Sequence, residues 1–313
     1  MNQLLRMAIS GSVSLFFLFG QALADPVSDA EQIRLSRQYH EVAQSLREQA
    51  DRGDAAAQSK LGEMYYQGHG VPLDYNEAVK WYRKAAQQNN AEGQWNLGHM
   101  YDFGRGVRED SREALKWYGL AAAQGLAAAQ HSLGVIYERG YGVKQDFDAA
   151  VKLYRLAAMQ GFVKAQYNLG VLYERGKGVA QDLVESMKWY RKAADQGHAK
   201  AQFNLGGFYD RGQGVSQDYD AALKLYRAAA EQGNSSAQFR MAEMYWYGYG
   251  TPRDYVQAHI WSSLAGGITE DTDEQTEAYA LRDLAASGMT AGQLVEAQDR
   301  ARKCVASEFK GCM

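Results

Sequence analysis

The chain has 313 residues, of which 46% are hydrophobic and 23% are charged, and its net charge at pH 7 is −3. This slightly negative net charge excludes the strongly basic surface that is typical of proteins that bind nucleic acid. Only three prolines occur, which favours helices. The 32 glycines recur at regular intervals and carry most of the pattern.

The first 24 residues have the layout of a secretory signal peptide. Arg6 supplies a positive charge, residues 7–20 are apolar, and residues 22–24 have the small residues of a cleavage site. We therefore expect cleavage between Ala24 and Asp25 and a periplasmic or secreted protein, with an uncleaved anchor as the alternative. No later stretch approaches 18 apolar residues, so we expect the mature chain not to be embedded in a membrane.

A motif of the form Leu-Gly-x-x-Tyr recurs along the chain. It starts at residues 61, 97, 133, 169 and 205, and a degraded copy starts at Met241. The spacing is 36 residues every time, which indicates one structural unit repeated six times. Leu61 and Tyr65 lie four residues apart, so they share one face of a predicted helix.

Each motif is followed by a Gly-x-Gly turn and an aspartate. Glycine readily takes the positive φ that ends a helix. Regular aspartates raise the possibility of calcium binding or catalysis, but one carboxylate per repeat at the start of a helix predicts N-caps. The six are Asp74, Asp110, Asp146, Asp182, Asp218 and Asp254. A glutamate three residues later predicts a capping box in three copies, at Glu77, Glu113 and Glu185.

The second half of each repeat predicts another helix, with Ala78, Trp81, Tyr82 and Ala85 in the first copy. The combined pattern L-G-x-x-Y-x-x-G-x-G-V-x-x-D-x-x-x-A-x-x-W-Y-x-x-A-A-x-x-G closely resembles the Sel-one-like repeat family, a branch of the tetratricopeptide-like helical solenoids. The resemblance implies an all-α fold, a right-handed α/α solenoid of helix-pair repeats, with six repeats over residues 53–268.

Segments on either side of the repeats are expected to cap the solenoid. Residues 25–52 predict an N-terminal capping helix. Residues 269–313 predict two capping helices, opened by Thr272 and Thr290, and a stapled tail. In an exported protein the only two cysteines, Cys304 and Cys312, predict a disulfide, with a metal pair or a reactive thiol as the alternatives.

The resemblance also implies a binding groove, because the first helix of each pair lines the concave face of related solenoids. Taking the motif leucine as register, we expect rings, asparagines and an acidic row to face this groove. They are Trp95, Asn96, His99, Asp102, His131, Glu138, Tyr167, Asn168, Glu174, Phe203, Asn204, Asp210, Phe239 and Trp246. We expect an extended or helical peptide to bind there, with the acidic row favouring basic side chains. The alternative is that the rings only pack repeat against repeat.

Members of this family act mostly as adaptors or scaffolds, which implies a non-catalytic protein that binds a protein or peptide partner in bacterial envelope processes or signalling. No P-loop, zinc-protease helix or nucleophile elbow occurs, and we expect no cofactor and no metal. Binding of peptidoglycan or of a small ligand is the alternative. A β-lactam-interacting enzyme is disfavoured, because the relatives that suggest it carry a cysteine pair in each repeat.

Overall fold

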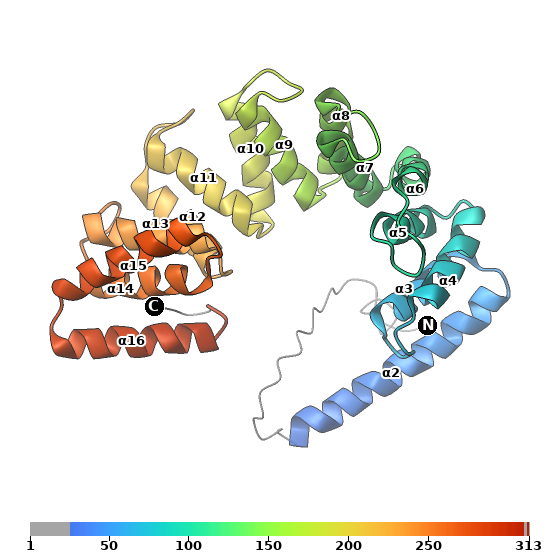
Figure 1. Ribbon diagram of the computed structural model, residues 1–313, viewed down its shortest axis with the longest axis horizontal. Helices are drawn as coiled ribbons and strands as arrows, with labels where there is room; N and C mark the ends of the chain where they lie inside the picture. Colours follow the sequence, from blue (N-terminus) through green and yellow to red (C-terminus); the bar gives the residue numbers. More distant parts are fainter. Residues whose placement is uncertain (1–25, 310–311, 313) are drawn as a thin grey trace.

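The computed structural model describes residues 26–309 and 312, and within these residues it contains fifteen α-helices and no strand. The helices follow one another along an open arch, with α2 (Pro26–Asp51) at one end and α16 (Ala291–Ala306) at the other (Figure 1). The predicted all-α repeat fold is thereby confirmed. The expected signal peptide, with its cleavage site at Ala24 and Asp25, lies outside the described residues.

Six helix pairs make up the arch, and we call the first helix of each pair its A helix and the second its B helix. The A helices are α3 (Ala55–Gln67), α5 (Ala91–Asp102), α7 (Ala127–Arg139), α9 (Val163–Arg175), α11 (Ala199–Arg211) and α13 (Ser235–Tyr247). The B helices are α4 (Tyr75–Gln87), α6 (Ser111–Ala123), α8 (Phe147–Met159), α10 (Leu183–Asp195), α12 (Tyr219–Ala230) and α14 (Tyr255–Ile268).

The ends of these helices follow the sequence signals closely. All six predicted aspartates cap their B helices, as Asp74 does by accepting from the backbone N–H groups of Asn76 and Glu77 at 2.9 and 3.0 Å. The capping boxes predicted at Glu77, Glu113 and Glu185 are wrong. Those side chains pair instead with the lysines three residues later, which offer a full positive charge.

A glycine and a tyrosine fill the centre of each of the first five repeats. Gly134 of α7 lies against the ring of Tyr154 of α8, and a β-carbon at Gly134 would come within 2.7 Å of that ring. Tyr154 is completely buried. The glycine of the Leu-Gly motif is therefore required by packing, because any larger residue would displace a buried ring.

A glutamine that the sequence analysis did not single out joins consecutive repeats. Gln166, buried in α9, donates to the carbonyl of Ala158 at the end of α8 (3.2 Å) and accepts from Gln196 beyond α10 (2.8 Å). The same two bonds recur around four other glutamines, namely Gln58, Gln94, Gln130 and Gln202. The C-terminal end of each of the first five B helices is thus bonded both to the A helix of its own repeat and to the A helix of the next repeat.

The second half of α2 stands in the place of a B helix before the first repeat. Arg47 donates to the hydroxyl of Tyr65 on α3, as Arg83 of α4 donates to Tyr101 on α5 at 3.1 Å. The carbonyl of Ala50 accepts from Gln58, as the B-helix carbonyls do in later repeats. The first A helix is therefore covered by an element that imitates the preceding repeat.

Two helices, α15 (Thr272–Ser287) and α16, cover the other end of the solenoid. Thr290 and Gln293 form the predicted capping box of α16. The predicted cap at Thr272 is wrong, because the carboxylate of Asp271, one residue earlier, accepts from the N–H groups of Asp273 and Glu274. An aspartate at that position competes successfully for the free amides.

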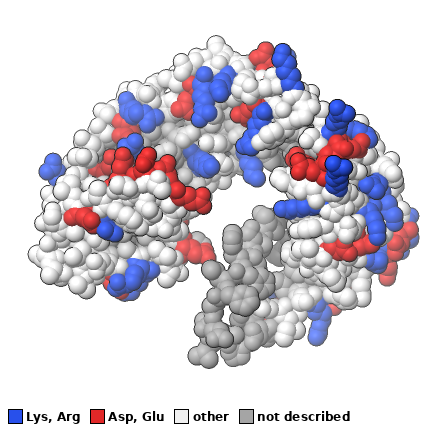
Figure 2. Space-filling model, in the orientation of Figure 1, with Lys and Arg blue, Asp and Glu red and all other residues white. Residues whose placement is uncertain are grey.

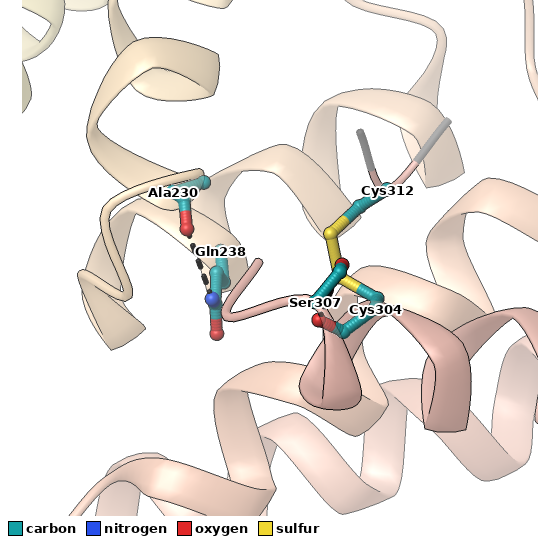
Figure 3. The surroundings of a disulfide bond; sticks show 5 residues. All are labelled: Ala230, Gln238, Cys304, Ser307 and Cys312. Atoms are coloured by element: carbon teal, nitrogen blue, oxygen red, sulfur yellow. Dashed lines mark hydrogen bonds between the residues drawn. A yellow bond between two sulfur atoms is a disulfide. The ribbon is translucent and has the colours of Figure 1, made fainter. Parts of the chain in front are cut away.

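The tail after α16 folds back onto the junction of the fifth and sixth repeats. The structure pairs Cys304 with Cys312, and Figure 3 shows the pair close to Gln238 of α13 and Ala230 of α12. The ring of Phe309 lies over Gly233, in the turn between those two helices, where a β-carbon would come within 3.2 Å of it. The tail therefore covers apolar surface that a seventh repeat would otherwise bury.

Candidate binding surface on the A helices

Consecutive A helices lie next to one another along the arch. Consecutive A helices touch through side chains: Trp95 Nε1 of α5 donates to Ser132 Oγ of α7 at 3.1 Å, and Asn168 Nδ2 of α9 lies 3.2 Å from His131 Nε2 of α7. Figure 1 shows α3, α5 and α7 on the inner side of the curve. The groove residues expected from the sequence all lie on A helices, from α5 to α13, and they form the candidate surface.

The rings of the expected ladder are half-buried and belong to the packing between repeats. His131 contacts Tyr154 of its own repeat (ring centroids 5.5 Å apart) and Phe162 at the start of the next A helix (5.2 Å). Tyr167 contacts Tyr190 and His198 in the same way, at 5.8 and 4.7 Å. The rest of the ladder, Trp95, Phe203 and Phe239, is also half-buried. The rings of His131, Tyr167 and Trp95 thus contact the next repeat, and all five rings leave part of their surface exposed.

Asparagines beside the ladder hold the rings in place. Asn168 is bonded to His131 of the preceding repeat, and Asn204 is hydrogen-bonded to Tyr167. Ser132 occupies the same position in the third repeat and holds Trp95. Asn96, at this position in the second repeat, is half-buried. The ring orientations are therefore fixed before any partner arrives.

Each carboxylate of the acidic row accepts a hydrogen bond from a buried tyrosine of its own repeat. Tyr154 and Tyr190 donate to Glu138 and Glu174, each at 2.6 Å. Tyr118 and Tyr226 donate to Asp102 and Asp210 at 3.2 and 3.1 Å. Burial and the adjoining carboxylate raise the pKa of all four tyrosines, so the hydroxyls stay protonated as donors. Burial also raises the pKa of Asp102. The row is thus part of the repeat's internal bonding.

An arginine follows the carboxylate at the end of three A helices, and the sequence analysis missed it. Arg139, Arg175 and Arg211 are exposed and lie eight residues after His131, Tyr167 and Phe203, on the same helix face. The Arg211 guanidinium lies over Gly207 of its own helix, 3.0 Å from where a β-carbon would stand. Their regular spacing of 36 residues was visible in the sequence and is the signal that would have revealed them.

The inner surface changes character toward the two ends. In the second repeat His99 lies beside Phe103 (centroids 4.5 Å apart) and contacts the edge of Tyr66 (5.8 Å). In the sixth, Trp246 replaces the carboxylate and packs on Tyr255 at 5.0 Å. The ends are therefore mainly aromatic, whereas the middle carries charged groups.

The histidines of this surface are neutral at physiological pH. Burial, and then the charge of Lys164, lower the pKa of His131 to about 4. Burial also lowers the pKa of His99 and of His198, whose Nδ1 accepts the N–H of Ala201 at the start of α11. These rings act as aromatic and hydrogen-bonding groups.

Within residues 26–309 and 312, no three or more His, Cys, Asp or Glu side chains converge as metal ligands. None of the helices in that part of the chain combines the length and the apolar character that a bilayer crossing requires.

Comparison with known proteins identifies the repeats. The family model of the Sel1 repeat matches residues 55–90, 91–126, 127–162, 163–198, 199–234 and 235–266. A crystal structure of a Sel1 repeat protein from Oxalobacter formigenes is 34% identical over 78% of this chain and 100% of that chain, with a TM-score of 0.70. The structure of c5321, described as a protective antigen in uropathogenic Escherichia coli strains, is 31% identical over 91% of this chain and 70% of that chain, with a TM-score of 0.57. No curated protein matches the chain.

Proposed function

The chain belongs to the Sel1 repeat family, and we propose that it is an exported, non-catalytic scaffold that binds a protein or peptide partner along its A helices, in a bacterial envelope process. The observation that carries the proposal is the row of partly exposed rings on the inner side of α5, α7, α9 and α11. A long open row offers repeated contacts to an extended segment, whereas a small substrate is usually bound in an enclosed pocket.

Rings that are already held in place make effective binding anchors. Tyr167 is held by the His198 ring at 4.7 Å and by Asn204, and Trp95 is held by its hydrogen bond to Ser132. These side chains have already lost their conformational entropy, so the entropic cost of ordering them when a partner binds is smaller. Aromatic residues and arginine dominate the binding energy of many protein interfaces.

Export is part of the proposal. It is supported by the layout of residues 1–24 and by the pairing of Cys304 with Cys312, since disulfides persist in oxidising compartments. N-terminal sequencing of the protein isolated from cells should find Asp25 as the first residue, and fractionation should place it in the periplasm or the medium. Recovery of the uncleaved chain from the cytosol would contradict this part.

The binding role is tested by capture from an envelope extract of the source organism. The bait is the mature protein, compared with a groove variant carrying Trp95→Ala, Tyr167→Ala and Phe203→Ala. A matched control variant carries Leu120→Ala, Leu156→Ala and Val184→Ala, which remove exposed apolar groups from the B helices. We expect one protein to be recovered by the wild type and the control but not by the groove variant.

Folding must be kept apart from binding, because the rings also pack between repeats. Circular dichroism and the melting temperature Tm of each variant provide the check. If the alanine variant loses helicity, leucine at the same three positions retains apolar volume while removing the rings. Recovery of the same protein by all baits contradicts the groove. Retention of purified peptidoglycan, with no protein recovered, would favour the glycan-binding alternative.

A further inference from the structure

The middle of the inner surface is basic in a protein whose overall charge is negative. The A helices of the third, fourth and fifth repeats (α7, α9 and α11) contain five Lys or Arg and three Asp or Glu residues, against a net charge of −3 for the whole chain. The five are Arg139, Lys164, Arg175, Lys200 and Arg211, and all are exposed. Figure 2 shows basic side chains projecting from the inner rim beneath the middle of the arch.

The acidic and basic groups on these helices differ in how freely they can meet a partner. Glu138, Glu174 and Asp210 are half-buried, and each accepts a tyrosine hydroxyl from its own repeat. By contrast, none of the three arginines has an ion pair with a carboxylate among the described residues. The groups left to attract a partner are therefore mainly cationic.

The arginines form an evenly spaced row that runs from repeat to repeat. Arg139 donates to the hydroxyl of Tyr141 at 3.2 Å, and Arg211 Nε donates to Gln213 at 2.9 Å, so both guanidinium groups are held near the Gly-x-Gly turns. Consecutive A helices contact each other through side chains, as at His131 and Asn168, and we take their separation as about 10 Å, the upper end for packed helices. An extended chain advances about 3.3 Å per residue. Three residues of extended peptide thus span about the distance between consecutive arginines.

We infer that the partner segment is an extended acidic peptide with a carboxylate at about every third residue. These carboxylates pair with Arg139, Arg175 and Arg211, and the apolar side chains of the peptide contact the rings together with Val135 and Val171. This inference deepens the proposed function and rests on it. It reverses the charge preference expected from the sequence, where the acidic row favours basic side chains. The reversal follows from the excess of five exposed cations over three half-buried carboxylates on α7, α9 and α11.

Three synthetic peptides of twelve residues test the spacing and the charge. The first repeats Asp-Leu-Ser four times, the second repeats Asn-Leu-Ser four times, and the third places four aspartates together before four Leu-Ser units. Binding to the full mature protein is measured by fluorescence anisotropy at low and high salt. We expect the spaced acidic peptide to bind at least about tenfold more tightly than the other two, with an affinity that falls as salt rises.

Two protein variants locate the site. Replacing Arg139, Arg175 and Arg211 together with glutamine should weaken binding of the spaced peptide about tenfold. The matched control replaces Lys152, Lys188 and Lys224 with glutamine, which removes the same charge from exposed positions on the B helices of the same repeats. Its affinity should stay within about twofold of wild type, and both variants should keep the wild-type Tm.

The outcomes separate this inference from the proposed function. Equal binding of the acidic and amide peptides, an unchanged affinity of the arginine variant, or no peptide binding at all would overturn the acidic-peptide inference. In each case the capture experiment can still succeed, and the protein-binding proposal then stands without a charge preference. If capture also fails, the proposed function itself is contradicted.

Discussion

The first five repeats and the sixth bury their helix pairs in different ways. In the fourth repeat Gly170 makes room for Tyr190, whose hydroxyl donates to Glu174 on the inner surface. In the sixth, Ala242, Ser262 and Trp246 stand at the same three positions. The buried Ser262 hydroxyl bonds to the Ala258 carbonyl of its own helix at 2.7 Å. The first repeat keeps Gly62 and Tyr82 but has Tyr66 at the carboxylate position, so only the glycine and the tyrosine change together and form one packing unit.

The hydrogen bonds of the buried glutamine also change at the sixth repeat. Gln238 of α13 donates to Ala230, as its counterparts do, but its Oε1 has no hydrogen-bond partner in the described part of the chain. The residue that would supply one is Ile268, at the position of Gln196 two repeats earlier. The bond within the repeat is therefore lost at the sixth, whereas the bond to the preceding repeat is kept. At the end of the array the lost bond gives way to the apolar cover of α15, α16 and the tail.

Moving the residues of the sixth repeat into the fourth should give the largest effect. We expect Tyr190→Ser to lower the free energy of unfolding by about 3–5 kcal/mol, because it empties a buried aromatic site. Gly170→Ala alone should cost about 1–3 kcal/mol, because its β-carbon meets the ring. The double variant should lose clearly less than the sum of the two, as measured by denaturant unfolding. Simple additivity would show that the two positions do not form a unit.

Removing the paired cysteines should affect the sixth repeat and spare the middle. Cys304→Ala with Cys312→Ala removes a loop closure worth about 2.5 kcal/mol and frees Phe309 from the turn at Gly233. Hydrogen exchange should quicken in α13 to α16 and stay unchanged in α7 to α9, which serve as the internal control. Equal acceleration in both regions would mean that the tail does not act locally.

Much of the fold was predictable, because its signals are local and repeated. The Leu-Gly motif, the six aspartate caps and the positive-φ glycines each require a particular residue type at one point of the period. The boundary at Asp271 was missed because Thr272 also suits an N-cap, and only the backbone decides between neighbouring candidates.

The surface was harder to predict, because its properties depend on pairs of distant residues. The acidic row was visible in the sequence, but the tyrosine that occupies each carboxylate lies 16 residues away. Gln166 looks like an ordinary polar residue of a helix until its partner, 30 residues later, is placed beside it. Whether a ring packs against the next repeat or is free to contact a partner likewise depends on the neighbouring repeat. His131 and Tyr167 pack against the next repeat and still leave part of their surface exposed.

The two kinds of glutamine should respond differently to the same substitution. Gln166→Leu removes two hydrogen bonds, one to the carbonyl of Ala158 and one from the side-chain amide of Gln196. Gln238→Leu removes only the bond to the carbonyl of Ala230, because the Gln238 Oε1 has no partner among the described residues. We therefore expect Gln166→Leu to lower the free energy of unfolding by about 1 kcal/mol more than Gln238→Leu. Equal losses in denaturant titrations would mean that the bond between glutamines contributes nothing.

The smallest expected effect concerns the ring position, which holds His131 in the third repeat and Phe239 in the sixth. Burial lowers the pKa of His131 to about 4, against about 6.5 when unfolded. Between these values the unfolded chain binds more protons, so the stability contribution is complete above about pH 6.5 and falls as the pH drops toward 4. His131→Phe should make the loss of unfolding free energy over this range shallower, by well under the limit of about 1.4 kcal/mol per pH unit for one proton, because the ring is only half-buried. The reciprocal Phe239→His should make it steeper, since that position is also half-buried. If neither variant changes the pH profile, the rings are more open to water than their contacts indicate.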